Sequence, residues 1–213
     1  MVCVFIEMRD VAAHESSKAK ATDLVFTANR FLDATVRAVR ESGGKPNRIY
    51  GHGLMALFGL DKDLPAASRQ ALEAVAMTKV SVDHLNDTFK EDLAEPIGFV
   101  VGMHAGSVTL GEVGYQDDVV FSAVGGVVRD AAHLLDLARL MPCDALISET
   151  VCAAAGLPAH VLTRRELTLP GSDRRMPVRA AADAAALFGA LDALVDVSAN
   201  FEEPPKGARL APA

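Results

Sequence analysis

The spacing of apolar residues divides the chain into strands and helices. The short apolar run over residues 2–8 is bounded by charged residues, which is typical of a buried strand. In residues 17–40, and again after Pro65, apolar side chains recur every three or four residues and predict two amphipathic helices. Between these helices, the Gly51-His52-Gly53 turn and its flanking apolar segments, the second ending at Leu60, predict a hairpin.

The second half of the chain continues with shorter elements. Strands are predicted at residues 97–104, 108–113, 119–124, 145–148, around Leu167 and at 176–180, with a polar loop at 115–118. Helices are predicted at residues 127–140, 149–155 and 181–195. His104 falls in a strand, and we interpret it as a packed residue. The order of elements predicts an α+β sandwich with helices on one face of a mostly antiparallel sheet.

Length and composition fit one globular domain over residues 1–182, followed by an Ala-rich C-terminal helix and a disordered tail at 183–213. The tail includes Pro204 and Pro205. Half of the 213 residues are hydrophobic, and the net charge of −7 argues against a nucleic-acid partner, because such binders usually show a basic stripe. Cys3, Cys143 and Cys152 have neither metal-site nor disulfide spacing, so we expect them to be buried.

The sequence gives no sign of a membrane span. No apolar run reaches the roughly 18 residues that a bilayer requires. The first six residues lack the basic region and cleavage site of a signal peptide. We therefore expect a cytoplasmic chain. An upstream sensor or membrane tether in a longer protein stays an open alternative, because the first apolar run begins directly after Met1.

Four blocks of sequence, in order along the chain, carry a family resemblance. Residues 4–10 read VFIEMRD, 43–59 read GGKPNRIYGHGLMALFG, 101–114 read VGMHAGSVTLGEVG and 122–134 read SAVGGVVRDAAHL. These blocks resemble the class III adenylate and guanylate cyclases, and ALISE at 145–149 resembles the strand before that family's closing segment. The resemblance implies a ferredoxin-like class III nucleotide cyclase fold, with residues 1–182 as the cyclase homology domain.

The resemblance places Glu7 and His52 where the family has two metal-binding carboxylates. In that family, two divalent ions activate the ribose 3′-hydroxyl and bridge the phosphates. Glu7 keeps the carboxylate, but magnesium prefers oxygen ligands, and an imidazole such as that of His52 suits transition metals. Magnesium or manganese is therefore the implied cofactor if the chain is active, and no cofactor if it is not. Alternatively, His52 is only a polar turn residue.

The resemblance also assigns nucleotide-binding and catalytic positions. Arg48 and Ser122 align with the residues that read the purine, and a hydroxyl there resembles the cyclases that select adenine. Arg129 and His133 align with the Asn that orients the ribose and the Arg that stabilises the transition state. Four residues apart on a helix, Arg129 and His133 share a face, but a neutral imidazole offers one donor instead of a guanidinium fork. Either residue could instead have only a structural role.

Two functions stay open on this basis. In the first, the chain is a catalytically impaired cyclase domain in cyclic-nucleotide signalling, which acts by dimerisation or by regulating a partner. The family's active site resembles a seam between two head-to-tail subunits, so a homodimer or a heterodimer with another cyclase domain is implied. In the second, the chain is a divergent adenylate cyclase that converts ATP to cyclic AMP and pyrophosphate. ATP is the expected nucleotide, and GTP is less favoured. A different activity on the same fold is a third alternative.

The charges of the aligned residues point to weak metal dependence. Glu7, Arg48 and Arg129, with both histidines neutral, give a net charge of +1. Such a pocket attracts phosphate but gathers cations poorly. We expect that any nucleotide binding depends less on metal than it does in an active cyclase. The chain has no P-loop, nucleophile-elbow or Cys-x-x-Cys motif, and its hairpin turn does not match that of a diguanylate cyclase.

Overall fold

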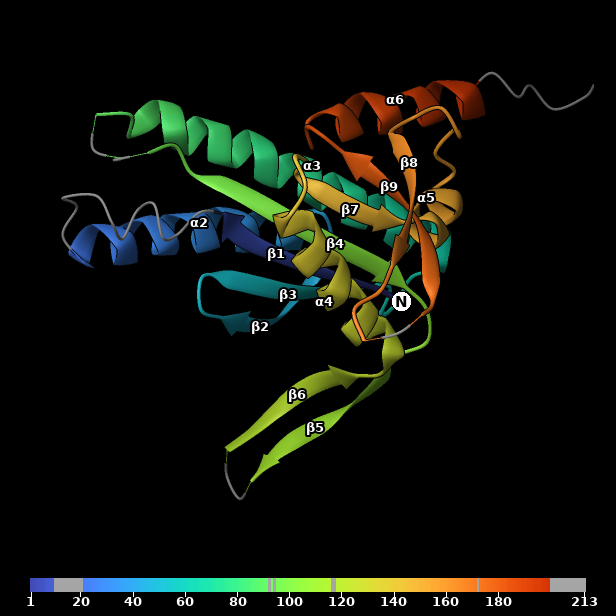
Figure 1. Ribbon diagram of the computed structural model, residues 1–213, viewed down its shortest axis with the longest axis horizontal. Helices are drawn as coiled ribbons and strands as arrows, with labels where there is room; N and C mark the ends of the chain where they lie inside the picture. Colours follow the sequence, from blue (N-terminus) through green and yellow to red (C-terminus); the bar gives the residue numbers. More distant parts are fainter. Residues whose placement is uncertain (10–20, 92, 94, 116–117, 172, 200–213) are drawn as a thin grey trace, which may run out of the picture.

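The computed structural model describes residues 1–9, 21–91, 93, 95–115, 118–171 and 173–199 (Figure 1). In chain order the elements are β1 (Val2–Arg9), α2 (Ala21–Glu41), β2 (Lys45–Tyr50), β3 (Gly53–Phe58), α3 (Leu64–Thr88), β4 (Gly98–Ala105), β5 (Thr109–Tyr115), β6 (Asp118–Val124), α4 (Gly126–Arg139), β7 (Ala145–Ser148), α5 (Glu149–Ala155), β8 (Thr163–Thr168), β9 (Arg175–Ala181) and α6 (Ala186–Ala199). The α+β class and the mostly antiparallel sheet are confirmed.

The main sheet has seven strands in the order β2-β3-β1-β4-β7-β9-β8. Among the described residues, its only parallel pair is β4 with β7, and the other neighbouring pairs are antiparallel. Strands β5 and β6 form a separate hairpin, which projects away from the main sheet (Figure 1). In the register of the main sheet, Gly53 pairs with both Glu7 and Tyr50, which places these two side chains on one face.

Helices cover both faces of the sheet, so the prediction of helices on one face was wrong. In β1, the side chains of Val2, Val4, Ile6 and Met8 pack into one core with α2, α3, α5 and α6. Cys3 lies in a cluster on the opposite face with residues of α4. The strand pairs are therefore buried from two sides, as the six consecutive buried residues of β3 also show. A strand that is apolar at every position fits such two-sided burial.

Gly102 lets α4 lie directly against the sheet. A Cβ at this position of β4 would lie 2.2 Å from the backbone nitrogen of Leu135 and 2.3 Å from the carbonyl oxygen of Ala131, both in α4. Only a residue without a side chain fits such an approach. At the β2–β3 turn, Gly51 has a φ of +52°, a conformation that glycine adopts readily. These glycines fix the position of α4 and of the turn that carries His52.

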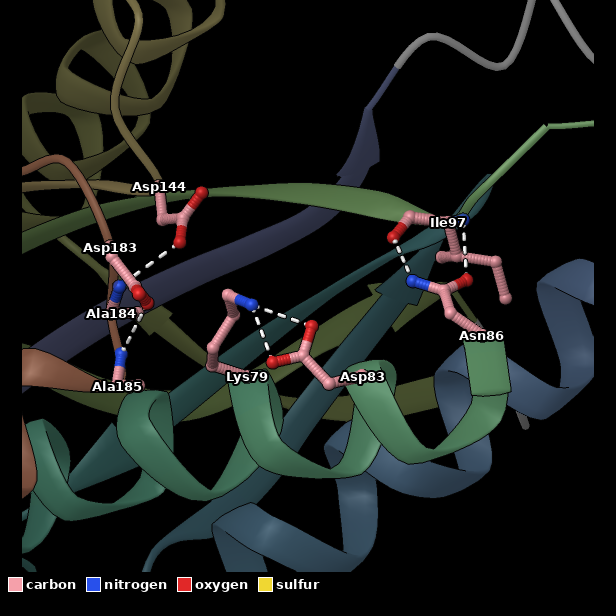
Figure 2. Close-up of polar contacts among 8 residues, drawn as sticks. All are labelled: Lys79, Asp83, Asn86, Ile97, Asp144, Asp183, Ala184 and Ala185. Carbon is pink, nitrogen blue, oxygen red and sulfur yellow. Dashed lines mark hydrogen bonds and ion pairs between the residues drawn. The ribbon is translucent and has the colours of Figure 1, made fainter. Parts of the chain in front are cut away.

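Polar side chains also join the sheet to α3 and to the turn before α6 (Figure 2). Asn86 of α3 donates to the carbonyl oxygen of Ile97 at 2.9 Å and accepts from its N–H at 2.7 Å. Asp144, just before β7, accepts from the N–H of Ala184 at 3.0 Å. These contacts hold the start of β4 and the entry to α6 in place.

Several predicted boundaries shift. Strand β9 runs through Ala181, so α6 begins at Ala186 and not at residue 181. The Asp183 side chain accepts from the N–H of Ala185 in the turn between them. Strand β8 covers 163–168, where only Leu167 was singled out. The predicted start of the first helix at residue 17 and the tail at 200–213 lie outside the described residues. The three cysteines are buried, as expected.

Over the part of the chain that the structure describes, no helix is both long and apolar enough to span a membrane.

Candidate functional site

Glu7 of β1 is held by an arginine that the sequence did not single out. Arg139, in the last turn of α4, donates from Nε to Glu7 Oε1 at 3.1 Å and from Nη2 to Glu7 Oε2 at 2.5 Å. His52 Nε2, from the β2–β3 turn, lies 3.6 Å from the same Oε1. The Glu7 side chain is only 12% exposed. The structure therefore brings Glu7 and His52 together, with both carboxylate oxygens already engaged.

The surroundings of this ion pair reinforce it. Arg139 also donates from Nη1 to Asp136 Oδ1 at 2.5 Å. Although burial acts to lower the pKa of Arg139, the hydrogen bond and the charge of Glu7 hold it above its ordinary value. Burial, followed by the charge of Glu7, raises the pKa of Tyr50, whose hydroxyl is buried without a hydrogen-bond partner. Arg139 thus stays cationic and Tyr50 neutral at physiological pH.

These residues do not fit the two divalent cations that the family resemblance implies. Magnesium takes six oxygen ligands in a near-octahedral arrangement. Glu7 is the one carboxylate of the predicted pair, and Arg139 occupies both of its oxygens. Among the described residues, no group of three or more His, Cys, Asp or Glu side chains could hold a metal ion.

Arg48 and Ser122 lie together, as the resemblance implies for the purine-reading pair. Arg48 Nη2 donates to Ser122 Oγ at 3.3 Å, which links β2 to β6. The neighbouring Asn47 donates from Nδ2 to the carbonyl oxygen of Phe121 at 3.0 Å. The β2–β3 register shifts between Pro46 and Arg48, which marks a bulge at Asn47. The bulge and Asn47 were not anticipated from the sequence.

Arg129 and His133 line a pocket of about 290 Å³ at the other end of α4. The Arg129 side chain is 67% exposed, and its Nε lies 3.7 Å from Asp130 Oδ1. Asp130 is buried and forms an ion pair with Arg174 from the β8–β9 loop. The pocket is rich in cationic groups, and Asp130 partly balances their charge.

His104 of β4 lies beside this pocket. Its Nε2 is 3.9 Å from Asp130 Oδ2, and burial lowers its pKa although the Asp130 charge acts in the opposite direction. The side chain is only 13% exposed. This confirms the interpretation of His104 as a packed residue.

Helix α4 separates the two predicted halves of the site. Arg129 and Arg139 are ten residues apart, which corresponds to about 15 Å along a helix axis. Glu7 and His52 lie at the Arg139 end, and His133 lies at the Arg129 end. Within one copy of the chain, the two halves do not form one site.

Comparison with curated proteins identifies relatives of moderate similarity. No protein-family model matches the chain. An adenylate cyclase of Anabaena cylindrica is 24% identical over 186 residues, covering 84% of this chain and 36% of that protein. An uncharacterized protein of Mycobacterium tuberculosis is 29% identical over 174 residues, covering 76% of this chain and 29% of that protein. The chain spans about a third of the length of these relatives.

Solved structures match this chain closely in fold and only distantly in sequence. The guanylyl cyclase Cya2 superposes with a TM-score of 0.75 at 18% identity, covering 84% of this chain and 89% of that one. The non-canonical dimeric guanylyl cyclase domain of a RhoGC fusion protein from Blastocladiella emersonii superposes with a TM-score of 0.65 at 14% identity, covering 84% of this chain and 94% of that one. This chain therefore has the fold of the class III adenylyl and guanylyl cyclase catalytic domains, and its sequence relatives include an adenylate cyclase.

Proposed function

We propose that the chain is a cyclase homology domain of cyclic-nucleotide signalling that pairs with a second cyclase domain and does not itself carry out two-metal cyclase chemistry. The observation that supports this most directly is the bidentate hold of Arg139 on Glu7. His52, where a second carboxylate would be required, adds no oxygen ligand. The pairing partner is a second copy of this chain or another cyclase domain.

The placement of the candidate residues supports pairing. The Arg129 and Arg139 ends of α4 are about 15 Å apart, so residues from both ends can meet at one nucleotide only across two chains. Strands β2, β5 and β6 also expose large apolar side chains, which are typical of a surface that another protein covers. They are Ile49, Val113, Phe121 and Val124. One solved structure of the Blastocladiella domain is a non-canonical dimer and another is monomeric, so these neighbours support pairing on this fold without fixing its arrangement.

The alternative is a divergent adenylate cyclase, and the pair of Arg48 and Ser122 favours it. A guanidinium donor and a hydroxyl, 3.3 Å apart, provide the donor and acceptor groups that recognition of a purine edge requires. In this alternative, ATP is the substrate, and Mg²⁺ or Mn²⁺ is the cofactor. In the favoured proposal, ATP or GTP is bound without turnover.

A product assay separates the two. The purified chain is incubated with ATP or GTP under Mg²⁺ and under Mn²⁺, and cyclic nucleotide is measured by chromatography. We expect no product above that of Glu7→Ala. Product that disappears in Glu7→Ala would refute the proposal and establish the alternative.

Nucleotide binding and pairing are tested separately. Calorimetry with ATP, with and without Mg²⁺, measures binding, and an absolute requirement for Mg²⁺ would contradict the favoured reading. Light scattering measures the mass of the chain alone, for the wild type and for Phe121→Ser. A monomer whose mass does not change when a second cyclase domain is added would contradict pairing.

A further inference from the structure

A groove lies between α2 and α3, on the face of the sheet that α4 does not cover (Figure 1). Its volume of about 350 Å³ lies at the lower end of the roughly 300–1,000 Å³ that small-molecule sites have. From α2 it is lined by Arg30, Ala34 and Arg37, which share one stripe of the helix. The side chains that line it from α3 are those of Val80, Ser81, His84 and Leu85. The small side chains of Ala34 and Ser81 leave the space between the helices open.

Both arginines of the groove keep their hydrogen-bond donors unused. Over the described residues, neither Arg30 nor Arg37 forms a hydrogen bond or an ion pair. The Cζ atom of Arg30 lies 5.0 Å from the ring centroid of Phe26 and 6.0 Å from that of Phe89. Contact with aromatic rings orients a guanidinium without using its N–H groups. Arg30 is thus held beside the groove with its donors available to a ligand.

The charges and apolar groups of the lining determine which ligand fits. Asp33 is the carboxylate among the lining residues, and it forms no ion pair within the described part of the chain. With His84 uncharged, the lining therefore carries a single net positive charge. Val80, which is 52% exposed, and Leu85 add apolar surface to the same groove. This lining suits a monoanion on an apolar chain, because a dianion would be repelled more strongly by Asp33 and a cation would meet two guanidinium groups.

We propose that the groove between α2 and α3 is a binding site for a carboxylate that carries an apolar chain. The carboxylate pairs with Arg30, which is already oriented, and Arg37 adds attraction at longer range. The apolar chain packs against Val80 and Leu85. The groove lies on the other face of the sheet from α4 and its ion pair with Glu7, so this inference does not rest on the proposed function.

The test is isothermal titration calorimetry of the full chain with three single-chain probes of near-equal length. They are decanoate, decyl phosphate and decyltrimethylammonium, each below its micellar concentration. Arg30→Gln and Arg37→Gln remove one positive charge each, and Asp33→Asn removes the opposing charge. Ser81→Leu fills the groove and keeps every charge. Arg175→Gln is the matched control, because it removes an exposed arginine of β9, outside the groove.

We expect one saturable site for decanoate in the wild type, weaker binding of decyl phosphate and no binding of decyltrimethylammonium. Arg30→Gln should raise the Kd of decanoate at least about fivefold, and Arg37→Gln should raise it less. Asp33→Asn should lower the Kd about twofold, because it removes a repulsion. Ser81→Leu should abolish binding, and Arg175→Gln should leave the Kd unchanged.

The absence of a saturable decanoate site in the wild type would overturn the proposal. Equal binding of decyltrimethylammonium would overturn it as well, because the surface would then select no charge. Tighter binding of decyl phosphate than of decanoate would refute the choice of a carboxylate. Decanoate binding that a folded Ser81→Leu leaves unchanged would place the site elsewhere on the molecule.

Two further measurements keep the test decisive. If Ser81→Leu lowers the mass of the chain in light scattering, a second copy covers the groove and the proposal is wrong. If a variant does not fold, judged by circular dichroism, amide NMR of the wild type with decanoate replaces it, and shifts confined to elements other than α2 and α3 would contradict the site. Neither readout involves cyclic-nucleotide production, so failure here is distinct from failure of the proposed function.

Discussion

Substitution of Gly102 tests whether α4 packs directly against β4, the arrangement that places Arg139 beside Glu7. In Gly102→Ala, the new Cβ would lie 2.2 Å from the nitrogen of Leu135 and 2.3 Å from the carbonyl oxygen of Ala131. Ordinary contacts begin at 3.4 Å, so the helix would have to move about 1.2 Å away from β4. Both obstructing atoms belong to the backbone and cannot rotate aside. The movement would carry Arg139 away from Glu7.

The expected loss of stability follows from two opposing terms. Overpacking a core costs about 1–3 kcal/mol, and the upper end applies because backbone atoms obstruct the methyl group. Replacing glycine with alanine lowers the entropy of the unfolded chain, which returns about 0.4–1 kcal/mol. The net destabilisation is about 2 kcal/mol. At roughly 2–4 °C per kcal/mol for a chain of this size, Tm should fall by about 4–8 °C.

The assay is thermal unfolding followed by circular dichroism, with Gly111→Ala as the matched control. Gly111 lies in β5, and a Cβ there would meet nothing within 4 Å. The control should therefore change stability by no more than about 0.5 kcal/mol. A Gly102→Ala protein that melts within about 1 °C of Gly111→Ala would refute the close seating of α4 on β4.

Three further predictions follow from the polar contacts. In a double-mutant cycle of Glu7→Gln and Arg139→Met, urea unfolding should show a coupling of about 1–2 kcal/mol, because the Glu7 side chain is 12% exposed and that of Arg139 is 42% exposed. Additive effects would exclude the pair. Burial lowers the pKa of His104 below 6.5, so the folded state binds fewer protons than the unfolded state, and stability should fall as the pH drops below 6.5. His104→Gln should remove that part of the pH dependence. The Arg179 side chain is 3% exposed and forms an ion pair with Glu149. Arg179→Met should therefore lower the free energy of unfolding, measured in urea, by about 3–5 kcal/mol. An effect under about 0.5 kcal/mol would contradict this.

Local patterns in the sequence were sufficient to predict most elements. The apolar periodicity of α2 and of α3 depends only on the conformation of each helix. In the same way, the glycines of the β2–β3 turn depend only on the conformation of that turn. The pairing of Arg48 with Ser122 was anticipated only through the family resemblance. These two residues are 74 positions apart and meet because β6, one strand of the β5–β6 hairpin, contacts β2.

The placement of helices could not be predicted from local patterns alone. Consecutive burial in β3 requires cover on both faces, but the periodicity of α4 does not show which face that helix covers. Arg139 was missed for a related reason. A basic residue in the last turn is favourable for any helix, so its sequence position gives no sign of a partner. Its contact with Glu7, 132 residues away, follows from the strand order and from the seating of α4 over Gly102.

The two ends of α4 differ in how far the chain satisfies its own polar groups, and under the proposed pairing this difference favours one end as the contact with a partner. At the Glu7 end, Arg139 occupies the carboxylate, so a ligand must break an existing ion pair before it can bind. At the other end, Arg129 is 67% exposed with one ion pair at 3.7 Å. His133 Nδ1 is buried without a hydrogen-bond partner in the described structure. If the chain pairs with an active cyclase domain, the contribution that costs least is therefore a half-site made of the Arg129 guanidinium and the His133 imidazole, presented to the partner's nucleotide.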